Sequence, residues 1–250
     1  MKFVRFVGND GLPRRAFEEN GKLREIEGEW YGEWAPKGRD YEAGEVKLLS
    51  PIQPNLFIGI ANNYVPQGQP VPPSPELPLF FLKPGSTVIG PDDPIRIPPS
   101  LNEVKFEAEL VAVIGKEARN VEESEALDYV FGYTLGNDVT APQLFHPAGP
   151  WTLGKSYDTF TPLGPAIVRT PDLQTLRVLS RLDGEVRQDS PLSCMIMSIA
   201  AQISYLSRVM TLRPGDALLT GAPDGAGMMG RGAVMECAAE GIGLLRNPVI

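Results

Sequence analysis

Short segments of apolar residues, separated by turns, predict a chain made of many strands and few helices. Continuous apolar segments at residues 56–61 and 104–114 predict buried strands. The β-branched and aromatic segment 130–140 predicts another, which ends at an Asn-Asp pair. Residues 2–7 alternate between apolar and polar and predict a strand near the N-terminus.

Helical periodicity is confined to two segments. Apolar residues recur at helical spacing across residues 191–210, the best predicted helix, and residues 124–130 predict a shorter one. Six prolines between residues 65 and 78 predict a loop of restricted conformation. Glycine and proline number 26 and 25 of 250 residues, an excess that favours turns and short strands.

The chain is expected to fold as a mainly β (α+β) protein with two regions. Residues 1–50 predict a small β-rich N-terminal region, in which the charged stretch up to Gly44 holds short strands at most. Residues 51–250 predict the main domain, long enough to bury a full core. Trp30, Tyr31 and Trp34 are interpreted as packing residues rather than ligand contacts.

Charge and cysteine content exclude several kinds of partner and site. The net charge is −8 and no block of Lys or Arg occurs, so neither nucleic acid nor an anionic membrane is expected as a partner. Cys194 and Cys237 cannot build a disulfide framework or a Cys-based zinc site. The first residues do not resemble a signal peptide, and no apolar segment approaches the ~18 residues of a membrane span. A cytoplasmic location is therefore expected.

Two glutamates interrupt the apolar segment 104–114. On a strand, residues i and i+2 share a face about 6.6 Å apart, so Glu107 and Glu109 are expected side by side. Adjacent carboxylates in an apolar setting resist ionisation unless a cation compensates them. The alternative is an edge strand with two solvated glutamates, which the apolar residues up to Ile114 disfavour.

A third carboxylate supports a metal site. Asp138 closes the strand 130–140, although alone it would suit a turn or cap. Together with Glu107 and Glu109 it forms a hard oxygen donor set, suited to Mg²⁺ or Mn²⁺, with Ca²⁺ also compatible. A 2-oxo acid is a natural chelator for such an ion, through its carboxylate and adjacent carbonyl oxygen.

Many short motifs, in one order, resemble the fumarylacetoacetate hydrolase superfamily over about residues 55 to 250. They are Phe80–Pro84, the Glu107/Glu109 segment, Gly132 through Asp138, Gly154–Phe160, Pro162–Pro165, Asp183–Asp189, Pro214–Asp216, Thr220–Pro223 and Gly241–Val249. The resemblance is especially to its 2-hydroxyhepta-2,4-diene-1,7-dioate and 5-carboxymethyl-2-hydroxymuconate isomerase members. It implies a mixed β-roll or barrel, a homodimer, and metal-dependent chemistry on 2-oxo acids.

The resemblance also implies roles for individual residues. It places Lys155 near the metal, where its charge would stabilise an enolate or hold the substrate carboxylate. Lys83 is a second catalytic candidate that could instead only brace the site. Substrate-binding candidates are Asn63, Tyr64, Gln67, Thr220 and Gly221.

Several substrate-facing positions depart from the family pattern. Hydrolases of the family carry a histidine and a glutamate on a mobile lid, where this chain has Gln67 and Pro70. Glutamine has no usable basicity near neutral pH. A substrate-contacting arginine is replaced by Pro142, and a threonine by Ala222. His146, the chain's only histidine, could act as a substitute base, although an exposed loop histidine is the commoner case.

These observations favour isomerase or decarboxylase chemistry through an enolate, because that chemistry needs no water nucleophile. Substrates would be 2-oxo or 2-hydroxydienoate acids, of the kind met in aromatic degradation. The alternative is carbon–carbon hydrolysis of an acylpyruvate or fumarylacetoacetate type, with His146 or metal-bound hydroxide as base. A third hypothesis is a metal- and ligand-binding protein without catalysis.

Overall fold

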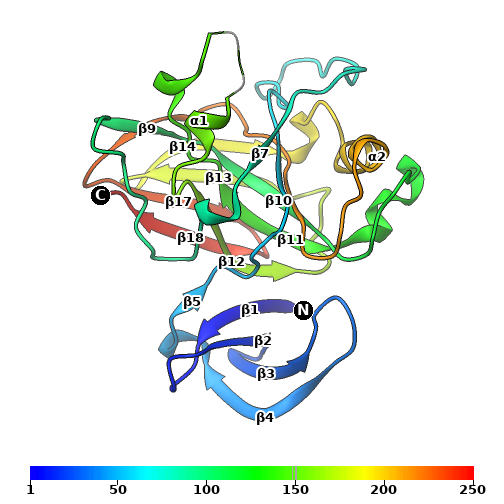
Figure 1. The fold of residues 1–250 in the computed structure, drawn as a ribbon, viewed down its shortest axis with the longest axis vertical. Helices are drawn as coiled ribbons and strands as arrows, with labels where there is room; N and C mark the ends of the chain where they lie inside the picture. The colour runs from blue at the N-terminus through cyan, green and yellow to red at the C-terminus, as the bar shows by residue number, and fades with distance from the viewer. Residues whose placement is uncertain (148, 150) are drawn as a thin grey trace.

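The structure is a computed structural model that describes residues 1–147, 149 and 151–250. The chain consists mainly of short strands (Figure 1). Among these residues are eighteen strands and only two α-helices. The helices are α1 (Thr152–Lys155) and α2 (Ile199–Val209), and the 3₁₀ turns are η1 (Ala43–Glu45), η2 (Gly85–Thr87), η3 (Glu123–Tyr129), η4 (Pro142–Leu144) and η5 (Leu192–Cys194). The prediction of a mainly β fold with few short helices is confirmed.

The largest sheet joins the N-terminal region to the main domain. Its order is β4-β3-β2-β1-β12-β11-β10-β15-β6-β7, with β5 beside β1 and β8 beside β12. The strands are β1 (Lys2–Val7), β2 (Pro13–Glu19), β3 (Lys22–Gly28), β4 (Trp34–Glu42), β5 (Leu48–Leu49), β6 (Phe57–Ile60), β7 (Phe80–Lys83), β8 (Val88–Ile89), β10 (Ala108–Ile114), β11 (Val130–Asn137), β12 (Thr161–Val168) and β15 (Ala217–Leu219).

Two smaller sheets complete the main domain. One has the order β14-β13-β17-β18 and the other pairs β16 with β9. The main core fills the space between the large sheet, the four-stranded sheet and α2. The strands are β9 (Glu103–Phe106), β13 (Arg177–Leu182), β14 (Glu185–Pro191), β16 (Gly227–Gly230), β17 (Val234–Ala239) and β18 (Gly243–Pro248).

The N-terminal region holds longer strands than the sequence predicts. β2, β3 and β4 have seven, seven and nine residues and form a meander at the bottom of Figure 1. The expectation of short strands is wrong because backbone pairing does not require apolar side chains on the exposed face. Phe3 packs on Trp30 and Phe131, with ring centroids 5.9 and 5.1 Å away. Trp34 also packs on Phe3, with ring centroids 5.8 Å apart, and Tyr31 packs on Phe131 at 5.0 Å, so Trp30, Tyr31 and Trp34 all make the expected packing contacts.

The predicted strand 104–114 is broken at Glu107. Residues before the break pair with β16, whereas residues after it pair with β11 and β15. The two halves belong to different sheets, and no apolar pattern reveals a change of pairing partner. Glu107 therefore lies at the junction of two sheets, where its side chain is not confined to one sheet face.

The predicted helix 191–210 begins later than expected. Ser198 caps it, since its hydroxyl accepts a hydrogen bond from the Ala201 amide at 3.0 Å. The four residues before α2 are not helical, and the amide of Met197 donates to the Asn63 side chain at 2.8 Å. A buried tertiary hydrogen bond thus replaces the first helical turns. The shorter predicted helix, 124–130, is the 3₁₀ turn η3.

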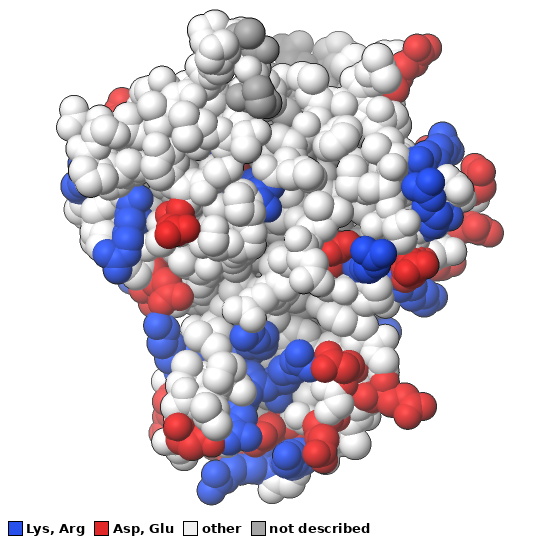
Figure 2. Space-filling view, viewed as in Figure 1, with Lys and Arg blue, Asp and Glu red and all other residues white. Residues whose placement is uncertain are grey.

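Positive and negative side chains intermingle on the N-terminal lobe, on the face shown in Figure 2. Both cysteines are buried and unpaired. No helix within the described residues has the length and apolar character needed to cross a membrane.

Candidate active site

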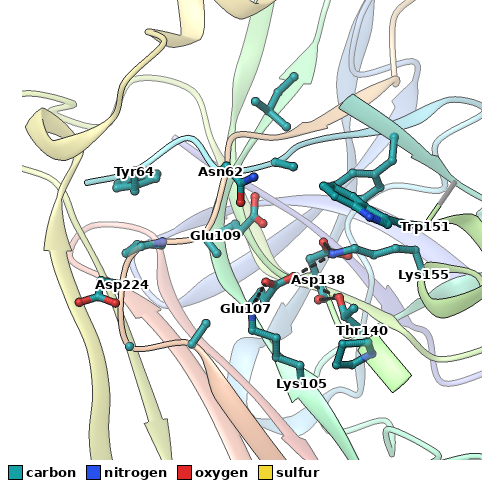
Figure 3. A pocket seen from close by; sticks show the side chains of 18 of the residues that line it. Asn62, Tyr64, Lys105, Glu107, Glu109, Asp138, Thr140, Trp151, Lys155 and Asp224 are labelled. Carbon is teal, nitrogen blue, oxygen red and sulfur yellow. Dashed lines mark hydrogen bonds and ion pairs between the residues drawn. The ribbon is translucent and has the colours of Figure 1, made fainter. Parts of the chain in front are cut away.

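One cavity of about 380 Å³ gathers all three predicted carboxylates (Figure 3). Its walls come from segments far apart in the sequence. The lining residues are Ile60, Ala61, Asn62, Tyr64, Pro66, Phe81, Lys105, Glu107, Glu109, Asp138, Thr140, Pro142, Phe145, Trp151, Lys155 and residues 222–226.

Glu107 is held where β9 gives way to β10. Its amide donates to the Asn137 side chain at 2.9 Å, and its carbonyl accepts from the Asp138 amide at 2.8 Å. Its carboxylate accepts hydrogen bonds from Lys105 at 2.7 Å, Lys155 at 2.8 Å and Thr140 at 3.1 Å. The end of β11 therefore fixes Glu107 beside Asp138.

Glu109 is a buried carboxylate on β10, with 2% of its surface exposed. Within the described residues it accepts one hydrogen bond, from the Gly221 amide at 2.6 Å. Burial, together with the charges of Asp138 and Glu107, raises the pKa of Glu109 well above its usual value. Gly221 has φ +108°, and a Cβ there would lie 2.6 Å from Asn63. Only glycine can present its amide to Glu109 in this way.

Asp138 is buried between two lysines. Lys83 and Lys155 each donate to one of its carboxylate oxygens. Although burial acts in the opposite direction, these two cations hold the pKa of Asp138 below its usual value. Burial likewise opposes the charge of Lys155, but Asp138 and Glu107 raise the pKa of Lys155 above its ordinary value.

The two predicted catalytic lysines occupy different places. Lys155 lines the cavity, and its ammonium lies 4.5 Å from the ring centroid of Phe81. Lys83 does not line the cavity; it donates to the carbonyls of Phe160 at 2.8 Å and Val139 at 3.2 Å. Lys83 is thus placed to brace Asp138, whereas Lys155 is placed to contact a ligand.

The donor set fits a hard divalent cation in its chemistry. Glu109 is buried without a hydrogen-bonding cation among the described residues, and burial together with the charges of Asp138 and Glu107 raises its pKa, so a bound cation would stabilise its ionised form. Among the described residues, no three His, Cys, Asp or Glu side chains form a ready metal site. Lys155 bridges Glu107 and Asp138, so a metal held by all three carboxylates requires Lys155 to release part of this bridge.

Four predicted substrate-binding residues do not line the cavity: Gly221, and three residues whose side chains are engaged elsewhere. Asn63 is buried and uses its side chain to hold Met197 and Thr220. The Thr220 hydroxyl donates to the Leu110 carbonyl at 2.9 Å. Gln67 is exposed and accepts from Arg177 at 3.1 Å. The expectation that they line the site is not met because each side chain is already engaged with protein groups. Tyr64 does line the cavity, and Gly221 contacts it through Glu109.

His146 lies outside this cavity and borders a separate surface hollow with Thr152 and Leu153. Pro142 and Ala222, which replace polar residues of the family pattern, do line the main cavity. Neither side chain offers a charge or a hydrogen bond. The lining of the described cavity therefore contains neither the histidine nor the glutamate of the hydrolase lid.

Sequence reasoning missed several lining residues. Trp151 stacks on Phe145 with centroids 5.6 Å apart and an interplanar angle of 18°, and Asn62 lines the cavity where Asn63 was expected. Lys105 had a detectable signal, since it lies two residues before Glu107 and shares the alternation of the two glutamates. Trp151 had none, because only the folded chain brings it to the wall.

The chain belongs to the fumarylacetoacetate hydrolase family. The family model "Fumarylacetoacetate (FAA) hydrolase C-terminal" matches residues 50–250, and a second, "Rv2993c-like, N-terminal", matches residues 1–51.

Its relatives carry out more than one kind of reaction. The mitochondrial oxaloacetate tautomerase fahd2 of Xenopus laevis is 40% identical over 222 residues, covering 82% of this chain and 69% of the relative. A 5-carboxymethyl-2-hydroxymuconate delta-isomerase from Mycobacterium smegmatis is 36% identical with TM-score 0.93, covering 100% and 99% of the two chains. A maleylpyruvate hydrolase from Sphingobium sp. SYK-6, in complex with manganese(II) and pyruvate, is 27% identical with TM-score 0.81, covering 100% and 99%. Family membership thus defines an enzyme class that includes isomerases, tautomerases and hydrolases.

Proposed function

We propose that this protein is a divalent-metal-dependent enzyme that acts on 2-oxo or 2-hydroxydienoate acids through an enolate, as a tautomerase, isomerase or decarboxylase. The observation that carries the proposal is the convergence of Glu107, Glu109, Asp138 and Lys155 in one cavity. The relatives that act on oxaloacetate and on 5-carboxymethyl-2-hydroxymuconate support the same chemistry.

Glu107, Glu109 and Asp138 would hold the ion, Mg²⁺ or Mn²⁺ being suited to their oxygens. When bound, it would supply Lewis-acid polarisation of the substrate C2 oxygen. Lys155 is protonated and 6% exposed at its side chain. Its N–H groups can donate to the oxygen on which negative charge develops, in a site largely screened from water. Phe81 and Trp151 form an aromatic wall beside Lys155.

Hydrolysis is the second candidate, favoured by the similarity to the maleylpyruvate hydrolase. It requires a base to activate water. His146, the candidate base, is absent from the lining of the described cavity, and Gln67, which replaces the lid histidine of the family, is not basic and is bound to Arg177. We therefore rank hydrolysis below enolate chemistry.

A comparison of reactions tests the ranking. With Mg²⁺ or Mn²⁺, we expect tautomerisation or decarboxylation of a short 2-oxo diacid to exceed acylpyruvate hydrolysis by at least ~10-fold in kcat/KM, about 1.4 kcal/mol in barrier. Lys155→Met should lower the favoured reaction by on the order of 10², whereas exposed Lys116→Met should not. Faster hydrolysis would refute the ranking, and tight metal binding without turnover would indicate a ligand-binding protein.

A further inference from the structure

We propose that Lys105 determines specificity by binding the second carboxylate of a short 2-oxo dicarboxylic acid. This inference rests on the proposed function and deepens it. The side chain of Lys105 lines the cavity beside Glu107, and Figure 3 shows it reaching that carboxylate from the lower wall.

The backbone of Lys105 is fixed while its side chain is accessible. Its amide donates to the Thr140 carbonyl at 2.7 Å, and its carbonyl accepts from the Thr140 amide at 3.0 Å. On its other side, Lys105 of β9 is paired with Met228 of β16. The side chain is 35% exposed, against 6% for Lys155. A ligand that enters the cavity can therefore meet the Lys105 ammonium without a backbone movement.

Lys105 has hydrogen-bonding capacity to spare. An ammonium carries three donors, and within the described residues that of Lys105 makes one side-chain contact, to Glu107 at 2.7 Å. Lys155, by contrast, bridges Glu107 and Asp138. Lys105 and Lys155 are the two cations among the described lining residues. Lys105 is thus the cation available to a second anionic group.

The rest of the lining orients such a group. Asp224 lies on the side of the cavity away from Lys155 and Trp151 in Figure 3, and its charge repels a carboxylate. Trp151 and Phe145 offer aromatic surface, and a carboxylate there would lose hydration without a partner.

The position of Lys105 also limits the length of the diacid. Its Nζ lies 2.7 Å from a carboxylate that we assign to the reaction centre, so the two ends of the substrate must be separated by only a few atoms. A longer diacid would carry its second carboxylate past the ammonium.

Two inert ligands test the assignment independently of turnover. N-oxalylglycine carries a chelating oxalyl end and a second carboxylate, and N-methyloxamate has the same chelating end without it. In titration calorimetry with Mg²⁺-loaded protein, Lys105→Met should lower the affinity for N-oxalylglycine by about 10- to 100-fold, the range for a hydrogen bond to a charged group. The affinity of the same variant for N-methyloxamate should change by less than about threefold. Lys105→Arg should retain most of the affinity, and exposed Lys116→Met all of it.

Steady-state kinetics supply the second readout. Lys105→Met should raise KM for oxaloacetate and leave kcat/KM for its 4-methyl ester nearly unchanged. If both ligands and both substrates weaken alike, Lys105 acts only through Glu107 and this inference is overturned. If the wild type binds neither ligand and turns over neither substrate, the proposed function itself fails.

Discussion

Asn63 is predicted to hold the fold together rather than to bind substrate, and Asn63→Ala separates the two roles. Its side chain donates to the carbonyls of Met197 at 3.0 Å and Thr220 at 2.8 Å. It also accepts from the Met197 amide at 2.8 Å. These bonds tie the segment after β6 to the start of α2 and the end of β15.

The magnitude follows from which groups lose their partners. Gln202 also donates to the Met197 and Thr220 carbonyls, at 2.8 and 3.3 Å, so both keep a donor in Asn63→Ala. The Met197 amide, which is a donor, is left without its acceptor. An unsatisfied buried donor costs about 1–3 kcal/mol and each lost hydrogen bond about 1 kcal/mol. We expect the free energy of unfolding to fall by about 2–4 kcal/mol, or Tm by roughly 5–15 °C.

Urea unfolding followed by circular dichroism measures this loss, with kcat and KM determined on the same preparations. Asn62→Gly is the matched control, since Asn62 is exposed at φ +54° and glycine adopts this conformation readily. The control should change stability by less than about 0.5 kcal/mol. Unchanged stability in Asn63→Ala together with a KM raised more than ~10-fold would refute the structural role and restore substrate binding.

Four further predictions concern the site and the assembly. The pKa of Glu109 is raised by burial and by the charges of Asp138 and Glu107. Protonated Glu109 therefore contributes stability below the pKa it has in the unfolded chain, about 4.3. This stability is lost as the pH rises through the higher pKa of the folded protein. In metal-free protein, thermal unfolding should therefore show Glu109→Gln above the wild type at pH 8 and level with it near pH 4; parallel pH profiles would contradict this. Lys83→Met removes a buried cation from Asp138 and should cost about 3–5 kcal/mol in urea unfolding, and an unchanged midpoint would argue against a bracing role. Light scattering should give the mass of a homodimer at micromolar protein, as family resemblance implies, and a monomer mass would be evidence against it. His146→Ala should leave activity nearly intact, and a loss of turnover would contradict this prediction.

Local sequence determined much of what carries the chemistry. Glu107, Glu109 and Asp138 could be recognised from the sequence as one set of carboxylates, and the strand 130–140 placed Asp138 at its end, close to where β11 stops at Asn137. The strand period accounts for Glu109 on β10 and turn chemistry for Asp138, and a few neighbouring residues specify both. The mainly β class followed from the same period and from the abundance of glycine and proline.

Other features depended on contacts that no local pattern encodes. The break at Glu107 exists because its flanking residues pair with different sheets. α2 begins at Ile199 because Asn63 holds the Met197 amide, and that same engagement leaves Asn62 on the cavity wall. Pairing partners and buried hydrogen bonds join residues more than a hundred positions apart, and their energies decide between local conformations of similar propensity. Tertiary structure alone therefore decided which side chains face the cavity and which make hydrogen bonds within the surrounding fold.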